Sequence, residues 1–170
     1  MMHVARSVGM IGLAMGGALA GTAACSRPAT LDEITPWLLC DECVDGELDS
    51  VVALGARAVP ALGRALIGPP AGRRDNMRRQ LVSRWNRIAV YLADEGRQPA
   101  MTQTDYVTQN IEHYEISYQR RSAIALGRIG GRRAIRALEG AAQMAGSGQL
   151  AYRPEVVTAI QRALTDARTR

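Results

Sequence analysis

Residues 120–142, RRSAIALGRIGGRRAIRALEGAA, contain the clearest structural signal in the chain. Small or apolar residues recur there at steps of three and four: Ala123, Leu126, Ile129, Ala134, Ile135, Leu138 and Ala142. This spacing places one buried stripe on each of two short helices. Gly130 and Gly131 separate the helices and can adopt the positive φ that ends a right-handed helix. The stretch therefore predicts two closely packed helices, joined by a sharp turn, that must pack on neighbouring helices.

The same stretch resembles a HEAT repeat of the short bacterial, PBS-lyase-like type, whose pattern is R-x-x-A-x-x-L-G-x-I-G-x-x-x-A-I/V-x-x-L. The matching residues are Arg120, Ala123, Leu126-Gly127, Ile129-Gly130, Ala134-Ile135 and Leu138. The family usually has Asp-Pro and a later Pro where this chain has Gly131-Arg132 and Arg136. Residues 51–66, VVALGARAVPALGRAL, form a weaker second copy, in which Leu54-Gly55 corresponds to Ile129-Gly130.

The resemblance implies an all-α fold, a short α-solenoid of about seven helices over residues 30–170, with its clearest repeats at 47–67 and 118–145. Composition agrees with one helical domain, because the 170 residues contain no Phe and only 4% aromatic residues. A core made of Ala, Leu, Ile and Val suits close-packed helices better than a sheet sandwich.

Local signals place the other helices. Thr30 and Glu33 form a capping box for a helix through Leu38. Residues 75–93 carry an apolar stripe of Leu81, Trp85, Ile88 and Leu92, which predicts an amphipathic helix. A long helix is expected from Thr104 into the repeat at 118–145. A last helix is expected to have Pro154 at its first position.

Residues 1–24 have the layout of an export signal: Arg6, then an apolar run over 8–20, then small residues before Cys25. This layout resembles a bacterial lipoprotein signal, which implies that Cys25 becomes the acylated first residue of the mature chain. Thr22 stands where the family usually has Leu, so an ordinary signal peptidase cutting at the same bond, and secretion, is an alternative. An uncleaved anchor is a third, although the apolar run is short for a spanning helix. Residues 25–29 would be a tether.

Cys40 and Cys43 remain once Cys25 carries lipid, and two thiols outside the cytoplasm can form a disulfide. Their spacing also matches redox CxxC motifs, but the adjoining Asp41 and Glu42 disfavour a thiolate. Zinc needs about four ligands, and the mature chain offers only these thiols and His113. We therefore predict no metal, no cofactor and no catalytic residue, and His113 is interpreted as a surface residue.

Charge is segregated along the chain, whose net charge is +5. Residues 32–49 contain seven acids and no Arg, whereas residues 57–87 contain eight Arg and one acid. In one interpretation the acidic segment neutralises the neighbouring arginines. In the other, a basic ridge faces anionic lipid headgroups or an acidic partner, because the guanidinium fork binds phosphate and carboxylate. The ridge comprises Arg73, Arg74, Arg78, Arg79, Arg84 and Arg87.

These observations predict a non-enzymatic protein-binding or scaffold module of the bacterial cell envelope, held on a membrane through acylated Cys25. In lipoproteins, Asp after the Cys is typical of inner-membrane retention, so Ser26 favours the outer membrane or periplasmic side. The partner is expected to be an envelope protein, and nucleic acid is not expected for an exported chain. The alternative is a thiol-redox or bilin-lyase-like enzyme that uses Cys40 and Cys43.

Overall fold

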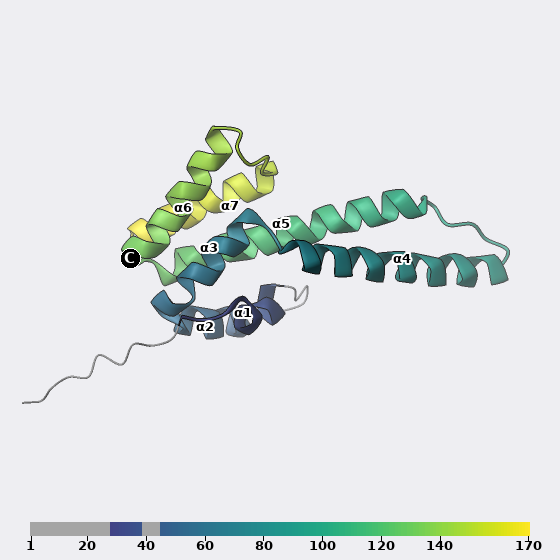
Figure 1. The fold of residues 1–170 in the computed structure, drawn as a ribbon, viewed down its shortest axis with the longest axis horizontal. Coiled ribbons are helices and arrows are strands. Elements are labelled where there is room, and N and C mark those ends of the chain that lie inside the picture. The colour runs from purple at the N-terminus through teal and green to yellow at the C-terminus, as the bar shows by residue number, and fades with distance from the viewer. Residues whose placement is uncertain (1–27, 39–44) are drawn as a thin grey trace, which may run out of the picture.

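The computed structural model describes residues 28–38 and 45–170, which form seven α-helices and no strand (Figure 1). The helices are α1 (Leu31–Leu38), α2 (Asp45–Ala53), α3 (Val59–Ile67), α4 (Ala71–Asp94), α5 (Gln103–Ile129), α6 (Gly131–Gly146) and α7 (Pro154–Arg168). A 3₁₀ turn, Gly55–Arg57, precedes α3. The all-α prediction is confirmed, and none of these helices is both long and apolar enough to cross a lipid bilayer.

The helices begin and end where local chemistry requires. At α1, the Thr30 backbone N–H donates to Glu33 Oε2 at 2.6 Å and the Glu33 N–H donates to Thr30 Oγ1 at 3.3 Å, which confirms the capping box. Pro154 occupies the first turn of α7, as predicted. Gly130 (φ 65°) alone separates α5 from α6, whose first residue Gly131 also has positive φ (76°). The chain thus turns sharply through a positive-φ backbone conformation that residues with a Cβ rarely adopt.

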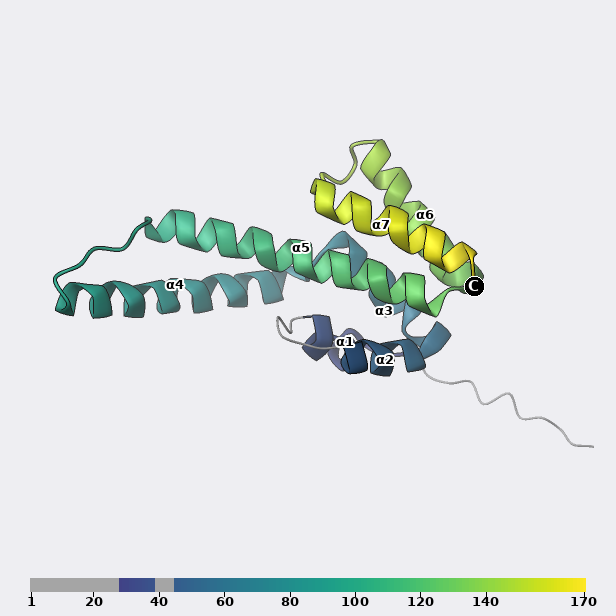
Figure 2. The same ribbon diagram turned by 180° about the vertical axis from the view of Figure 1, so that it is seen from behind.

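The body of the protein has three layers of helices, seen in Figures 1 and 2. The middle layer is α3 with the second half of α5; α1 and α2 pack on one side, and α6 and α7 on the other. Alanine recurs throughout the core, as composition predicted, and the largest fully buried side chains include Tyr118, Leu62, Leu126, Leu138 and Ile160. The segments at 47–67 and 118–145 are neighbours, because α3 packs on both α5 and α6. Solenoid geometry itself stays a prediction.

The chain joins the core earlier than expected. Ala29, assigned to the tether, is only 2% exposed. Its backbone N–H donates to the Arg57 carbonyl at 2.9 Å. The segment that separates Cys25 from the folded body is therefore shorter than the predicted tether.

α5 and α7 approach each other closely at Gly127. A Cβ added to Gly127 would lie 2.9 Å from Ala163 Cα and 3.1 Å from its carbonyl oxygen. Both residues are buried. The small residues of this stretch therefore allow a close approach, as predicted, but the partner helix here is α7 and not the adjoining α6.

The first half of α5 and all of α4 leave the body as a two-helix arm, defined as residues 71–117 (Figures 1 and 2). Its apolar contacts are few: Leu81, Val107 and Ile111 are buried, with Met77, Val82 and Tyr106 partly buried against them. The stripe predicted on α4 is thus only partly correct, because Trp85 and Leu92 are half-buried and Ile88 is 39% exposed. A third element would be needed to cover this stripe, and the described chain provides none there.

α4 begins at Ala71, four residues before the start predicted at Asp75. Pro69 and Pro70 do interrupt the chain, but the Pro70 carbonyl accepts hydrogen bonds from the N–H groups of Arg73 and Arg74. These bonds close the first turn of α4 and draw Ala71 and Gly72 into the helix.

The contact between Gly127 and Ala163 can be tested by substitution. We expect Gly127→Ala to lower the free energy of unfolding by about 1–2 kcal/mol, because overpacking outweighs the gain in helix propensity. The control is Gly140→Ala in α6, where the new Cβ meets nothing within 4 Å. It should raise that free energy by about 0.5–1 kcal/mol. Equal changes in the free energy of unfolding for the two variants, measured by urea denaturation, would contradict the close approach of α7 to Gly127.

Candidate functional site

A pocket of about 610 Å³ lies between α4 and α5 in the part of the arm nearest the body. Its wall combines arginines, other polar side chains and apolar side chains: Arg79, Arg84 and Arg87; Gln80, Ser83, Asn110, His113, Tyr114 and Ser117; and Leu38, Met77 and Leu81. None of these twelve residues is an acid. Because α4 supplies the arginines and α5 supplies His113, the pocket exists only when the two helices pair.

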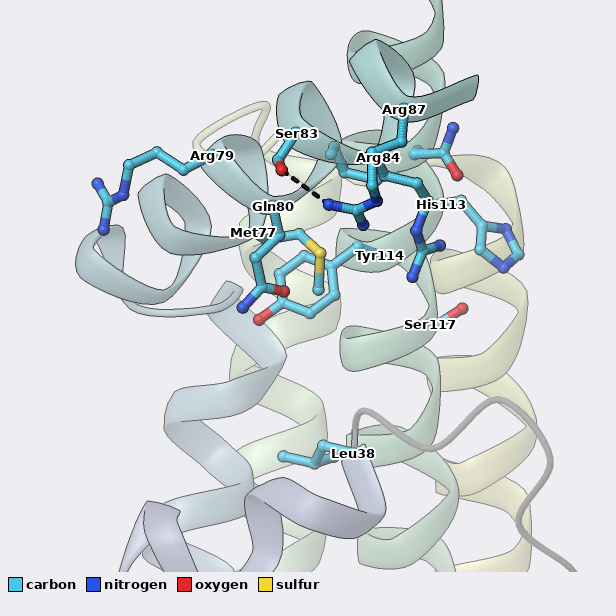
Figure 3. A pocket seen from close by; sticks show the side chains of 12 residues that line it. Leu38, Met77, Arg79, Gln80, Ser83, Arg84, Arg87, His113, Tyr114 and Ser117 are labelled. Atoms are coloured by element: carbon cyan, nitrogen blue, oxygen red, sulfur yellow. Dashed lines mark hydrogen bonds between the residues drawn. The ribbon is translucent and has the colours of Figure 1, made fainter. Parts of the chain in front are cut away.

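Two of the arginines come together inside this pocket. Arg84 and Arg87 are one turn apart on α4, and Figure 3 shows their side chains on the side that His113 also lines. Arg87 Nη1 donates to Ser83 Oγ at 2.9 Å, which fixes that guanidinium. Arg79 points away from the pair. The pocket therefore presents two convergent guanidinium groups with an imidazole beside them.

The acids nearest His113 in the sequence are occupied elsewhere. Glu112 forms an ion pair with Arg153, just before α7. Glu115 Oε1 accepts from Arg74 Nε at 2.6 Å. Among residues 28–38 and 45–170, no carboxylate lies within ion-pair distance of Arg84 or Arg87. Two like charges one turn apart repel each other, so the site favours an anion that binds both.

The predicted basic ridge is divided by the fold. Arg73 pairs with Asp32 of α1, and Arg74 pairs with Glu115, so both are neutralised within the protein. The Arg73 pair matches the interpretation in which the acidic segment neutralises nearby arginines. Arg78 is exposed and does not line the pocket, whereas Arg79, Arg84 and Arg87 do.

His113 is exposed, as expected, but its place beside the arginines was not predicted. It shares one face of α5 with Asn110, Tyr114 and Ser117, at steps of three and four. That spacing was visible in the sequence, yet the sequence did not show which face of α5 meets α4. Burial raises the pKa of Tyr114, with the neighbouring Tyr118 as a further cause, so its phenol is held neutral.

The distal end of the arm, residues 88–101, exposes large apolar side chains. Four of the six such side chains in the described chain lie here: Ile88 (39%), Val90 (63%), Tyr91 (61%) and Met101 (40%). Val90 and Tyr91 border a shallow depression with Arg87, which also lines the basic pocket. Exposed apolar groups beside arginine are typical of surfaces that contact other proteins.

The predictions on the export signal at 1–24, on acylation of Cys25 and on pairing of Cys40 with Cys43 fall outside the described residues and stay predictions. Within the described part of the chain, no group of three or more His, Cys, Asp or Glu side chains is placed to hold a metal ion.

The contrast between Arg74 and Arg84 predicts opposite effects of the same substitution. At low ionic strength, Arg74→Gln should lower the free energy of unfolding by about 0.5–1 kcal/mol, because it removes an ion pair with a largely covered carboxylate. Arg84→Gln should raise it by about 0.2–0.5 kcal/mol, because it relieves repulsion from Arg87. Both differences should shrink in high salt. Changes of the same sign would contradict this assignment of charges.

No protein-family model, curated protein or solved structure matches this chain. The resemblance to HEAT repeats therefore rests on the residues quoted for it.

Proposed function

We propose that this chain is an exported, membrane-tethered, non-enzymatic module that binds a protein partner in the bacterial cell envelope through the arm. The observation that carries the proposal is the distal end of the arm, where Val90 and Tyr91 are more than 60% exposed. Side chains of this size contribute most to binding when a partner covers them, and tyrosine and arginine are frequent at the centres of protein interfaces.

The geometry suits a tethered module. Three residues separate Cys25 from the buried Ala29, which limits an extended link to about 14 Å. An acylated Cys25 would therefore hold the body next to the lipid surface. The body, which includes α1, lies at the opposite end of the arm from the loop that joins α4 to α5 (Figure 1). Since α4 has 24 residues, it is about 36 Å long. The arm then displays its distal end away from the anchored end.

Lipid attachment is tested by feeding labelled fatty acid to cells that express the protein. We expect the wild-type chain to carry the label and to fractionate with membranes. The Cys25→Ala variant should lose the label and should keep residues 1–24. A wild-type chain that takes up no label would remove the acylation from the proposal.

Partner binding is tested with a photo-crosslinking residue at Asp94, which borders the depression with Val90 and Tyr91. Cells should yield one adduct of discrete mass, and Tyr91→Ser in the same chain should reduce it strongly because the apolar contact is lost. The matched control places the crosslinker at the exposed Gln143 of α6 and should yield no such adduct. Adducts of equal yield from both positions, or an adduct that Tyr91→Ser leaves undiminished, would refute binding through the arm.

A further inference from the structure

We propose that the pocket between α4 and α5 binds an organic phosphate, with its phosphate between Arg84 and Arg87 and its carbon body against Tyr114 and Met77. This site lies closer to the body than the distal end of the arm and does not depend on the proposed protein partner.

Charge indicates the class of anion. A phosphate monoester carries a charge of about −1.5 to −2 at pH 7 and has three acceptor oxygens. It can therefore neutralise two guanidinium groups at once, whereas one carboxylate would leave one of them uncompensated. Arginine also binds phosphate through two parallel hydrogen bonds. His113 adds a further nitrogen on the same side of the pocket.

The site is prepared for a ligand by the contacts around it. Ser83 Oγ accepts a hydrogen bond from Arg87 at 2.9 Å and holds its side chain along α4. Glu112 and Glu115 flank His113 in sequence, but each is engaged by an arginine outside the pocket. Glu112 and Glu115 are thus held by other arginines, and no carboxylate of residues 28–38 and 45–170 forms an ion pair with Arg84 or Arg87.

Volume and wall chemistry indicate that the phosphate is attached to a larger group. A space of about 610 Å³ is within the usual range for small-molecule sites, about 300–1,000 Å³, and much larger than a bare phosphate needs. Met77 and Tyr114 offer apolar surface for a carbon body, while Asn110 and Ser117 can hydrogen-bond to hydroxyl groups. The phosphate monoester can belong to a soluble molecule or to phosphatidic acid, whose headgroup is itself a phosphate monoester.

The first experiment titrates the purified full chain with glycerol 3-phosphate and follows the thermal midpoint and calorimetric binding. We expect a saturable rise in the midpoint that glycerol and an equal ionic strength of chloride do not reproduce. Arg84→Gln and Arg87→Gln should each weaken binding about tenfold or more, because a hydrogen bond between charged groups is lost. The matched control is Arg78→Gln, which removes the same charge from α4 outside the pocket and should leave the affinity unchanged.

The second experiment distinguishes the source of the phosphate. The same four chains are floated with phosphatidylcholine vesicles that contain or lack phosphatidic acid, so that any acyl anchor contributes equally to all. Binding of glycerol 3-phosphate supports a soluble ligand. Stronger flotation with the phosphatidic acid vesicles, lost with Arg84→Gln and kept with Arg78→Gln, in the absence of glycerol 3-phosphate binding, supports a lipid headgroup.

Two results would overturn the proposal: no binding in either experiment, or equal weakening of binding by Arg78→Gln. These measurements use no protein partner. A failure of crosslinking at the distal end therefore leaves them unaffected, and their failure leaves the protein-binding proposal standing.

Discussion

The contact between Gly127 and Ala163 determines how the rest of the molecule is arranged. Helices usually pack with their axes about 8–10 Å apart, but a residue without a side chain lets α7 lie against the backbone of α5. α5 is one continuous helix of 27 residues. Its second half is held by α3 and α7 in the body, and its first half forms one side of the arm. The direction of the arm is therefore fixed by packing in the body, not by contacts within the arm.

This dependence explains why α4 is held by polar contacts as well as by apolar ones. The arm buries only three apolar residues, which is little for a helix of this length. Ion pairs at its base add to them: Arg73 joins α4 to α1, and Arg74 joins α4 to α5. Further out, Gln103 Nε2 donates to Asn86 Oδ1 at 2.8 Å and links the two helices near the distal end. Such contacts contribute little each, but they set the register that brings His113 next to the arginines of α4.

The features that the sequence predicted are those that depend on neighbouring residues. The capping box at Thr30, the turn at Gly130 and the start of α7 at Pro154 all involve groups within four positions of one another. The features it missed depend on which helices meet. The stripe on residues 75–93 correctly indicated a helix, but burial of Ile88 would need a covering element that the described fold lacks there. Periodicity identified the face of small residues around Gly127. It did not identify α7 as the helix that packs against this face. The pocket was missed because it depends on which face of α5 is turned toward α4, and the sequence does not show the orientation of a helix about its own axis.

The arginines of α4 are of two kinds. Arg73 and Arg74 each meet a carboxylate, so the fold itself explains their presence. Arg84 and Arg87 meet no carboxylate among the described residues, although α5 carries two glutamates one turn or less from His113. Those glutamates engage Arg74 and Arg153 instead. Two adjacent positive charges left facing a pocket lower the stability of the unliganded protein, and no ion pair within residues 28–38 and 45–170 accounts for them. An anion that spans both guanidinium groups does, because it supplies the negative charge that the protein places elsewhere.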